Sequence, residues 1–370
     1  MNASPERIMY LALELGNREW KLGFTVAGGK LRLRSMPARS MARLQAEIRE
    51  AKEKFGLAAD ARARSCYEAG RDGFWLHRWL TEQGVESQVV DPASIEVNRR
   101  LRRAKTDRLD ARSLAGRLVR YWEYGEQRQW SVIHVPAEVD EDARRPRREM
   151  ERLTGEQTGH LARIRSLLAL QGVVVMKVSR ATVLGAKDWA GRALPAALQA
   201  ELERELNRLE LVREQLRNLE RVQVETLKQP HTAGERASAK LASLKSLGVV
   251  TAVTLGGEFF GWRSFQNRRQ VGACAGLTGT PYDSGGQRRE QGISKAGNRR
   301  VRHLMVEQAW RWLHWQPQSD LSRWFRERFG SGGARLRRVG IVALARKLLV
   351  AFWKYVAFDL VPGGAVLKPA

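Results

Sequence analysis

The chain has 370 residues, and its 65 Lys and Arg against 40 Asp and Glu give a formal net charge of +25. This length allows two or three domains and at least one full hydrophobic core. A globular chain this basic repels itself, so we expect a polyanionic partner, with nucleic acid ahead of a membrane surface. Two cysteines, Cys66 and Cys274, are too few for a disulfide framework or a zinc cluster.

The two ends of the chain give no sign of a membrane protein. The N-terminal residues lack a long apolar run behind a basic start, which makes them a poor signal peptide. Residues 339–361 are apolar, but Arg346, Lys347 and Lys354 interrupt them short of the roughly 20 residues that a membrane span needs. We therefore expect a long buried helix here and a soluble, cytoplasmic protein.

The first third of the chain has the pattern of an α/β domain. Apolar or alternating runs predict strands at residues 7–15, 20–28 and 29–37, with a hairpin between the last two. A helix is predicted at residues 40–56, ending at a glycine. Short strand and helix patterns then alternate up to the helix that begins near residue 107. This order predicts a mixed sheet with helices packed on it.

The rest of the chain is predicted to be mostly helical. A basic helix at residues 141–171 is expected to break near Pro146. Residues 194–227 repeat leucine at spacings of three and four, which predicts a coiled-coil seam or one face of a helical hairpin, within or between chains. Residues 228–238 read as a linker. A Gly-rich interruption at residues 276–298 divides the basic C-terminal helices.

These patterns predict α/β plus all-α architecture in three regions. The predicted boundaries are an α/β domain at residues 1–140, a helical or coiled-coil region at 141–235 and a mostly helical domain at 236–370.

Four acidic residues form the first candidate site. Asp107 and Asp110 share a helix face because they are three residues apart, and they could simply pair with nearby arginines. Glu14 and Glu68, however, stand at the ends of two predicted strands, where the site residues of α/β proteins gather. Four converging carboxylates would suit Mg²⁺ or Mn²⁺, and two such ions can clamp the oxygens of a phosphodiester exchange.

A glycine-flanked serine forms the second candidate site. Two glycines follow Ser284, so a phosphate can approach its hydroxyl closely, and Ser294 is the alternative. Six cations surround these serines and are candidates for nucleic-acid binding: Arg288, Arg289, Lys295, Arg299, Arg300 and Arg302. The same residues also fit a non-catalytic alternative, in which a Gly-rich turn is followed by a basic helix that only binds a nucleic-acid backbone.

The acidic motifs resemble a known family. The stretches "LALELG", "CYEAG" and "KTDRLDA" look like the N-terminal domain of the DEDD insertion-sequence transposases. These are bridge-RNA-guided recombinases related to Piv-type DNA invertases. The resemblance implies an RNase H-like (RuvC-like) domain in which Glu14, Glu68, Asp107 and Asp110 bind the metal ions. The family usually carries Asp at the first of these positions, whereas this chain carries Glu14.

The C-terminal motifs resemble the transposase domain of the same family. The matching stretches are "FQNRRQVGACAGLTGTPYDSGG", "GISKAGNRRVRHLMVEQA" and "RVGIVALARKLL". The resemblance implies that Ser284 is the nucleophile of a covalent phosphoserine step in DNA strand exchange, and that the protein binds donor DNA, target DNA and a guide RNA. Strand exchange needs several active sites, so a dimer or tetramer is expected.

Residues 244–255 look like a helix-hairpin-helix element, with Gly248 at the second glycine position and Ser246 at the first. The amides of such a turn can hold a phosphate.

Two other functions stay open from the residues. The first is a RuvC-type structure-specific nuclease, in which metal-activated water attacks and no serine adduct forms. The second is a degenerate transposase that only binds nucleic acid, for which Glu14 is the supporting feature.

Overall fold

The computed structural model describes residues 7–95, 107–284 and 287–369, with only the backbone described at residues 93, 107–109, 281–284 and 287–291. Two compact units divide the chain, Met1–Val135 and Pro136–Ala370. Each unit has its own hydrophobic core.

A five-stranded mixed sheet forms the centre of the first unit, as the sequence predicts. The strands are β1 (Met9–Leu15), β2 (Glu19–Val26), β3 (Arg32–Pro37), β4 (Ala63–Glu68) and β5 (Val85–Val90). Their order is β3-β2-β1-β4-β5, with β1, β2 and β3 antiparallel and β1, β4 and β5 parallel. A tight turn joins β2 to β3, and Gly28 adopts a positive φ of 68° there.

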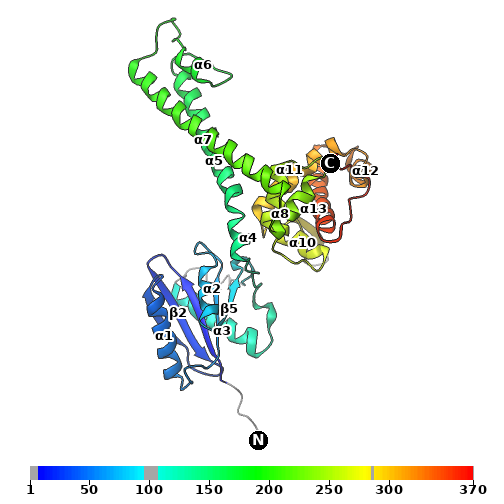
Figure 1. The fold of residues 1–370 in the computed structure, drawn as a ribbon. Coiled ribbons are helices and arrows are strands. Elements are labelled where there is room, and N and C mark those ends of the chain that lie inside the picture. Colours follow the sequence, from blue (N-terminus) through cyan, green and yellow to red (C-terminus); the bar gives the residue numbers. More distant parts are fainter. Residues whose placement is uncertain (1–6, 96–106, 285–286, 370) are drawn as a thin grey trace. The chain divides into compact units, whose positions relative to one another are not determined.

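Helices cover both faces of this sheet (Figure 1). They are α1 (Met41–Lys54), α2 (Trp75–Glu82) and α3 (Asp107–Glu123), with short 3₁₀ turns at Pro92–Ser94 and Gln127–Gln129. Successive side chains of a strand point to opposite faces. Met9, Leu11 and Leu13 of β1 accordingly pack in one core with α1 and α2, whereas Tyr10 and Ala12 pack in another with α3.

A close backbone approach holds α3 against the sheet. A Cβ added at Gly23 of β2 would lie 3.1 Å from the carbonyl oxygen of Ala111 and 3.3 Å from the Cβ of Ala115. Glycine therefore lets the helix sit nearer to the strands than any side chain would.

A helical hairpin begins the second unit. Its helices are α4 (Glu138–Asp142), α5 (Arg145–Ala169), α6 (Arg180–Leu184) and α7 (Ala196–Lys228), and Figure 1 shows α5 and α7 side by side. The predicted break occurs just before Pro146, which lies in the first turn of α5, where its missing N–H costs no helical hydrogen bond.

The leucine seam of α7 faces α5 of the same chain. Leu202, Leu206 and Leu209 pack against Ile164 and Leu168. Nearer the other end, Val212 and Leu216 share a smaller core with Met150 and Leu153. The structure thus uses the seam for an intramolecular helical hairpin.

The predicted linker at residues 228–238 is wrong over most of its length. Helix α8 (Ala233–Ala242) begins inside it, because Thr232 and Glu235 form a capping box. The Thr232 hydroxyl accepts a hydrogen bond from the Glu235 N–H, and the Glu235 carboxylate accepts one from the Thr232 N–H. Only three residues, 229–231, separate α7 from the cap.

The remaining elements include a long C-terminal helix with one buried face. They are α9 (Val249–Leu255), a π-helical turn η4 (Gly256–Phe260), α10 (Arg268–Cys274), β6 (Gly279–Ser284), β7 (Gln287–Ile293), α11 (Arg299–Trp315), α12 (Asp320–Phe329) and α13 (Ala334–Phe358). Leu344, Leu348 and Phe352 of α13 are fully buried. The ring centroids of Phe352 and Trp312 are 5.6 Å apart. Among the helices that the structure describes, none has the length and apolar character of a membrane span.

Candidate functional site

Two of the predicted acids lie at one edge of the first unit's sheet. Strands β1 and β4 are parallel neighbours, and Leu13 lies opposite Tyr67 in their register. Glu14 and Glu68 are the next residues along each strand, so they stand side by side at the carboxyl ends. Both line one cavity, together with the loop from Ala69 to Gly73. The structure therefore brings together two residues that are 54 positions apart in the sequence.

Helix α3 brings its first turn toward the same edge. The hydroxyl of Tyr10, near the start of β1, donates a hydrogen bond to Glu123 at the end of α3. Ala111, near the start of α3, instead approaches Gly23, which pairs with Ala12 further along β1. The helix consequently runs antiparallel to β1, with its N-terminus toward the strand end that carries Glu14.

The alternation of the strands puts both glutamates on the face that α3 covers. Glu14 follows Tyr10 and Ala12 at intervals of two, and Glu68 follows Cys66, whose thiol lies 4.0 Å from the Leu114 carbonyl oxygen of α3. Burial raises the pKa of the Cys66 thiol, and the nearby charge of Glu68 adds to that rise. This thiol is therefore held protonated and unreactive.

Asp110 is half-buried in the first turns of α3. The side chain of Asp107 lies outside the described residues, although its backbone begins the helix. Within the described part of the chain, three or more Asp, Glu, His or Cys side chains do not converge into a ready metal cluster. The donor chemistry of the edge still fits Mg²⁺ or Mn²⁺, because Glu14 and Glu68 offer carboxylate oxygens to one cavity.

A third acid at this cavity was not predicted from the sequence. Asp72 lines it, and its side chain is only 7% exposed because it forms ion pairs with Arg39 and Arg71. Asp72 lies in a loop rather than at a strand end, so no periodicity marked it. Its arginine partners make it a support of the loop that closes the cavity.

The two candidate serines occupy opposite ends of the β6–β7 hairpin. Ser284 ends β6 and pairs with Gln287 across the turn, whereas Ser294 directly follows β7 at the base. Ser294 lies against Thr278, six residues before Ser284, so at roughly 3.3 Å per strand residue the two positions are about 20 Å apart. The sequence predicts only a Gly-rich interruption here and not the two strands, because glycine and charged residues obscure the alternation of the strand residues.

Ser294 is fastened to the adjoining segment. Its N–H donates to the carbonyl of Thr278 at 2.8 Å, and its hydroxyl accepts a hydrogen bond from the Thr278 hydroxyl at 3.5 Å. The side chain of Ser284 lies outside the described residues, as do those of Arg288 and Arg289. The hairpin therefore separates a serine at its turn from a serine held at its base.

The other predicted cations differ in their surroundings. Lys295 and Arg299 are exposed, as a phosphate contact requires. Arg302 instead donates to the carbonyls of Ala275 and Ala296 and so holds the loop before α11.

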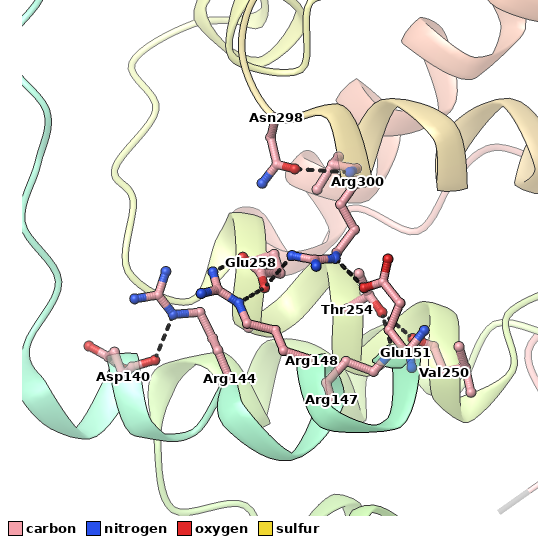
Figure 2. A network of polar contacts seen from close by, with 12 residues as sticks. Asp140, Arg144, Arg147, Arg148, Glu151, Val250, Thr254, Glu258, Asn298 and Arg300 are labelled. Carbon is pink, nitrogen blue, oxygen red and sulfur yellow. Dashed lines mark hydrogen bonds and ion pairs between the residues drawn. The ribbon is translucent and has the colours of Figure 1, made fainter. Parts of the chain in front are cut away.

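Arg300 belongs to a network that Figure 2 shows from close by. The carboxylate of Glu258, 4% exposed in the π-helical turn η4, accepts two hydrogen bonds from Arg148 of α5 at 2.6 and 2.9 Å. Arg300 of α11 donates to Glu258 at 3.2 Å and also to Glu151 of α5. This network ties the base of the helical hairpin to the helix that follows the serine hairpin.

Glu258 was not predicted as a special residue, although a single acid in the run "GGEFF" was a usable signal. Burial alone would raise its pKa. Hydrogen bonds from Arg148 and the charges of Arg148, Arg300 and Arg144 outweigh burial and hold the pKa of Glu258 below its ordinary value.

The helix-hairpin-helix resemblance falls on the turn between α8 and α9. Gly248 is the N-cap of α9, and Ser246 is buried. The C-terminal segment covers part of this turn, because the Lys245 N–H donates to the carbonyl of Val366 and the Lys368 ammonium donates to the Leu247 carbonyl. At least one turn amide is thus already bonded within the chain.

Comparison with known proteins assigns the class. A model of the transposase IS116/IS110/IS902 family matches residues 238–322, which include Glu258, the serine hairpin and Arg300. This segment of the chain therefore resembles part of a transposase, a class of enzyme that acts on DNA.

Relatives along most of the chain define the family. A Sinorhizobium fredii protein named as a transposase is 41% identical over 383 residues, covering 97% of this chain and 94% of the relative. A second such protein of that organism is 30% identical over 66% of this chain and 57% of its own length. A Yersinia enterocolitica protein, named as the transposase for insertion sequence element IS1328, is 30% identical over 21% of this chain and 23% of its own length. The chain belongs to the IS116/IS110/IS902 family of transposases.

Proposed function

We propose that this transposase catalyses RNA-guided DNA strand exchange through a phosphoserine intermediate, with assistance from divalent metal ions. The observation that carries the proposal is the acidic sheet edge, where Glu14 and Glu68 line one cavity at the ends of neighbouring strands. The strand order β3-β2-β1-β4-β5, with three antiparallel strands followed by two parallel ones, supports an RNase H-like domain.

Glu14, Glu68, Asp107 and Asp110 would hold Mg²⁺ or Mn²⁺ in this proposal. The direction of α3 supports the inclusion of both aspartates, because its first turn points toward the two glutamates. When bound, the metal would supply positive charge that stabilises the phosphodiester in its transition state. Glu14 keeps the charge of the aspartate usual in the family and reaches one methylene further.

Ser284 is the proposed nucleophile. Its Oγ attacks a DNA phosphorus, an Oγ–P bond forms, and one bridging DNA oxygen leaves. A hydroxyl of the second DNA strand then attacks the phosphoserine and releases Ser284. The end of β6, beside two glycines, offers the close approach that this attack needs. Ser294 is the alternative, and its bonds to Thr278 weigh against it.

The remaining parts of the proposal concern partners. A net charge of +25 supports simultaneous binding of DNA and RNA. In an RNA-guided reaction, base pairing chooses the sequence, whereas the protein reads backbone and shape. A homo-oligomer, dimer or tetramer, would hold several active sites together.

Covalent trapping tests this function. The full-length protein, a matching guide RNA and labelled donor DNA are combined with Mg²⁺, and protein–DNA adducts are separated under denaturing conditions. We expect an adduct with the wild type and with Ser294→Ala, and none with Ser284→Ala.

Two outcomes would overturn the proposal. Metal-dependent cleavage with no adduct in any variant supports a RuvC-type nuclease instead. Retained nucleic-acid binding with neither adduct nor cleavage supports a degenerate, binding-only protein.

A further inference from the structure

A cavity of about 110 Å³ lies within the second unit, away from the serine hairpin. The base of α5, the end of α7, the start of α8 and the turn η4 enclose it. Residues from all four elements line it, among them Arg144, Arg147, Gln223, Glu235, Glu258 and Trp262. A cavity of roughly 150 Å³ takes up a benzene ring, so this smaller enclosed space admits the edge of a ring system rather than a whole one.

Gln223 of α7 is the first sign that the cavity binds something. Its side chain is 5% exposed and lines the cavity. Neither its Oε1 nor its Nε2 has a hydrogen-bond partner among the described residues. A buried amide without bonds destabilises a fold. Leucine has nearly the same shape and would fill this position without that cost.

Two arginines are the second, independent sign. Arg144 is 6% exposed; its Nε donates to the Asp140 carbonyl, and its guanidinium lies 5.1 Å from the centre of the Trp262 ring. Arg147 donates to the hydroxyl of Thr254 at 2.9 Å. In the described structure neither arginine forms an ion pair with a carboxylate, and burial lowers the pKa of both guanidinium groups.

Two of the three acids that line the cavity are already engaged elsewhere. Glu258 accepts hydrogen bonds from Arg148 and Arg300, as Figure 2 shows. Glu235 closes the capping box at the start of α8. Asp140 is the third lining acid, so Arg144 and Arg147 leave one positive charge in excess of it beside the amide of Gln223, and an anionic ligand would balance that charge.

We propose that the base edge of one unpaired nucleotide enters this cavity against Gln223, while the rest of the nucleotide stays at the mouth with its phosphate against Arg144 and Arg147. A glutamine amide presents one acceptor and two donors, which complement the donor and acceptor pair on a base edge. Arginine guanidinium groups match the geometry of a phosphate. An everted base is commonly held in this way, in a small pocket that reads its edge.

The nucleotide can belong to a DNA strand or to an RNA strand, because both carry the same chemistry at these contacts. The inference uses neither the acidic sheet edge nor either serine. It can therefore be tested without divalent metal and without turnover, and its failure would leave the proposed reaction untouched.

Binding to single strands gives the first test. The full-length protein in EDTA is titrated against fluorescein-labelled 12-nucleotide DNA and RNA single strands, read by fluorescence anisotropy. We expect Gln223→Leu to weaken binding to at least one of them by about tenfold, the loss typical of one good base contact. Gln215→Leu, at an exposed position of the same helix, should bind like the wild type.

The arginines have their own matched pair. Arg147→Gln should weaken binding at least fivefold more than Arg152→Gln, which removes an equal charge from an exposed position of α5. A thermal melt separates binding from folding. Gln223→Leu should melt at or above the wild-type temperature, because it removes an unpartnered buried amide. If leucine is not tolerated, Gln223→Met serves the same purpose.

Crosslinking locates the base and identifies its source. Single strands that carry 4-thiothymidine or 4-thiouridine are irradiated with the wild-type protein, and the modified peptide is mapped. A crosslink within residues 222–227 or 140–147 from the DNA or the RNA probe supports the pocket and names the strand. Unchanged affinity of the Gln223 variant for both strands, or crosslinks only outside the cavity lining, would overturn the inference.

Discussion

Two groups of acids in this basic chain show how differently a carboxylate can be placed. Glu258 is enclosed, 4% exposed, and bonded to Arg148 and Arg300 from two other helices. Glu14 and Glu68 are half-buried at the end of a sheet and line an open cavity. An acid surrounded by arginines of its own chain joins structural elements. The acids at the two neighbouring strand ends instead line a cavity that a ligand can enter.

The largest expected effect follows from removing charge at the sheet edge. Glu68→Gln should reduce DNA strand exchange about a thousandfold, because roughly 4 kcal/mol of transition-state stabilisation is lost with the metal site. Glu14→Asp, which keeps the charge and shortens the side chain by one methylene, should stay within tenfold of the wild type. A recombination assay with donor and target plasmids measures both. Equal rates for Glu68→Gln and the wild type would show that the acids at the strand ends do not take part in the reaction.

Truncating the enclosed acid should affect stability instead. Glu258→Ala leaves Arg148 and Arg300 without their shared carboxylate, and we expect the free energy of unfolding of the second unit to fall by about 3 kcal/mol. Chemical denaturation followed by the helical circular dichroism signal measures this change. Glu151→Ala removes the exposed partner of the same Arg300 and should cost less than about 1 kcal/mol. Similar losses for the two variants would show that enclosure does not distinguish Glu258.

A change that touches no carboxylate should also disturb the sheet edge. Gly23→Val places side-chain atoms against Ala111 and Ala115, and overpacking of this kind costs about 1–3 kcal/mol. The displaced α3 would move Asp110 away from the glutamates, so strand exchange should fall about tenfold. Gly116→Ala, which meets open space on the same helix, should leave activity unchanged. Full activity in Gly23→Val would mean that the position of α3 does not matter.

The smallest effect is a dependence of stability on pH. The folded-state pKa of Glu258 is below its ordinary value of 4.5, so its stabilising contribution is complete above pH 4.5 and is lost as pH falls through the folded pKa. The difference in unfolding free energy between the wild type and Glu258→Gln should be constant near neutral pH and shrink below pH 4.5. Denaturation curves at several pH values measure it. A difference that persists to pH 3 would contradict the ion-pair account.

The sequence predicts the first unit well because its strands and helices carry clear periodicity. It also marks Glu14 and Glu68, since strand ends in a parallel pair must meet at one edge. It fails where side-chain chemistry overrides composition. Thr232 and Glu235 start a helix inside a polar stretch that looks like a linker.

Other features depend on contacts between distant residues. Asp72 reaches the cavity only because Arg39 holds it there, 33 positions away. The leucine spacing of α7 predicts an apolar seam, but the spacing alone does not tell whether α5 of the same chain or a helix of another chain packs against it. The orphaned amide of Gln223 becomes visible only when four separate elements close around it.

Metal binding tests the central claim most directly. Mn²⁺ is titrated into the full-length protein without nucleic acid, and free ion is measured by electron paramagnetic resonance. We expect the wild type and Glu258→Gln to bind Mn²⁺ alike, and Glu68→Gln to bind at least tenfold more weakly, because carboxylate oxygens at the sheet edge supply the ligands. Equal Mn²⁺ affinity in the wild type and Glu68→Gln would contradict the assignment of this edge as the metal site.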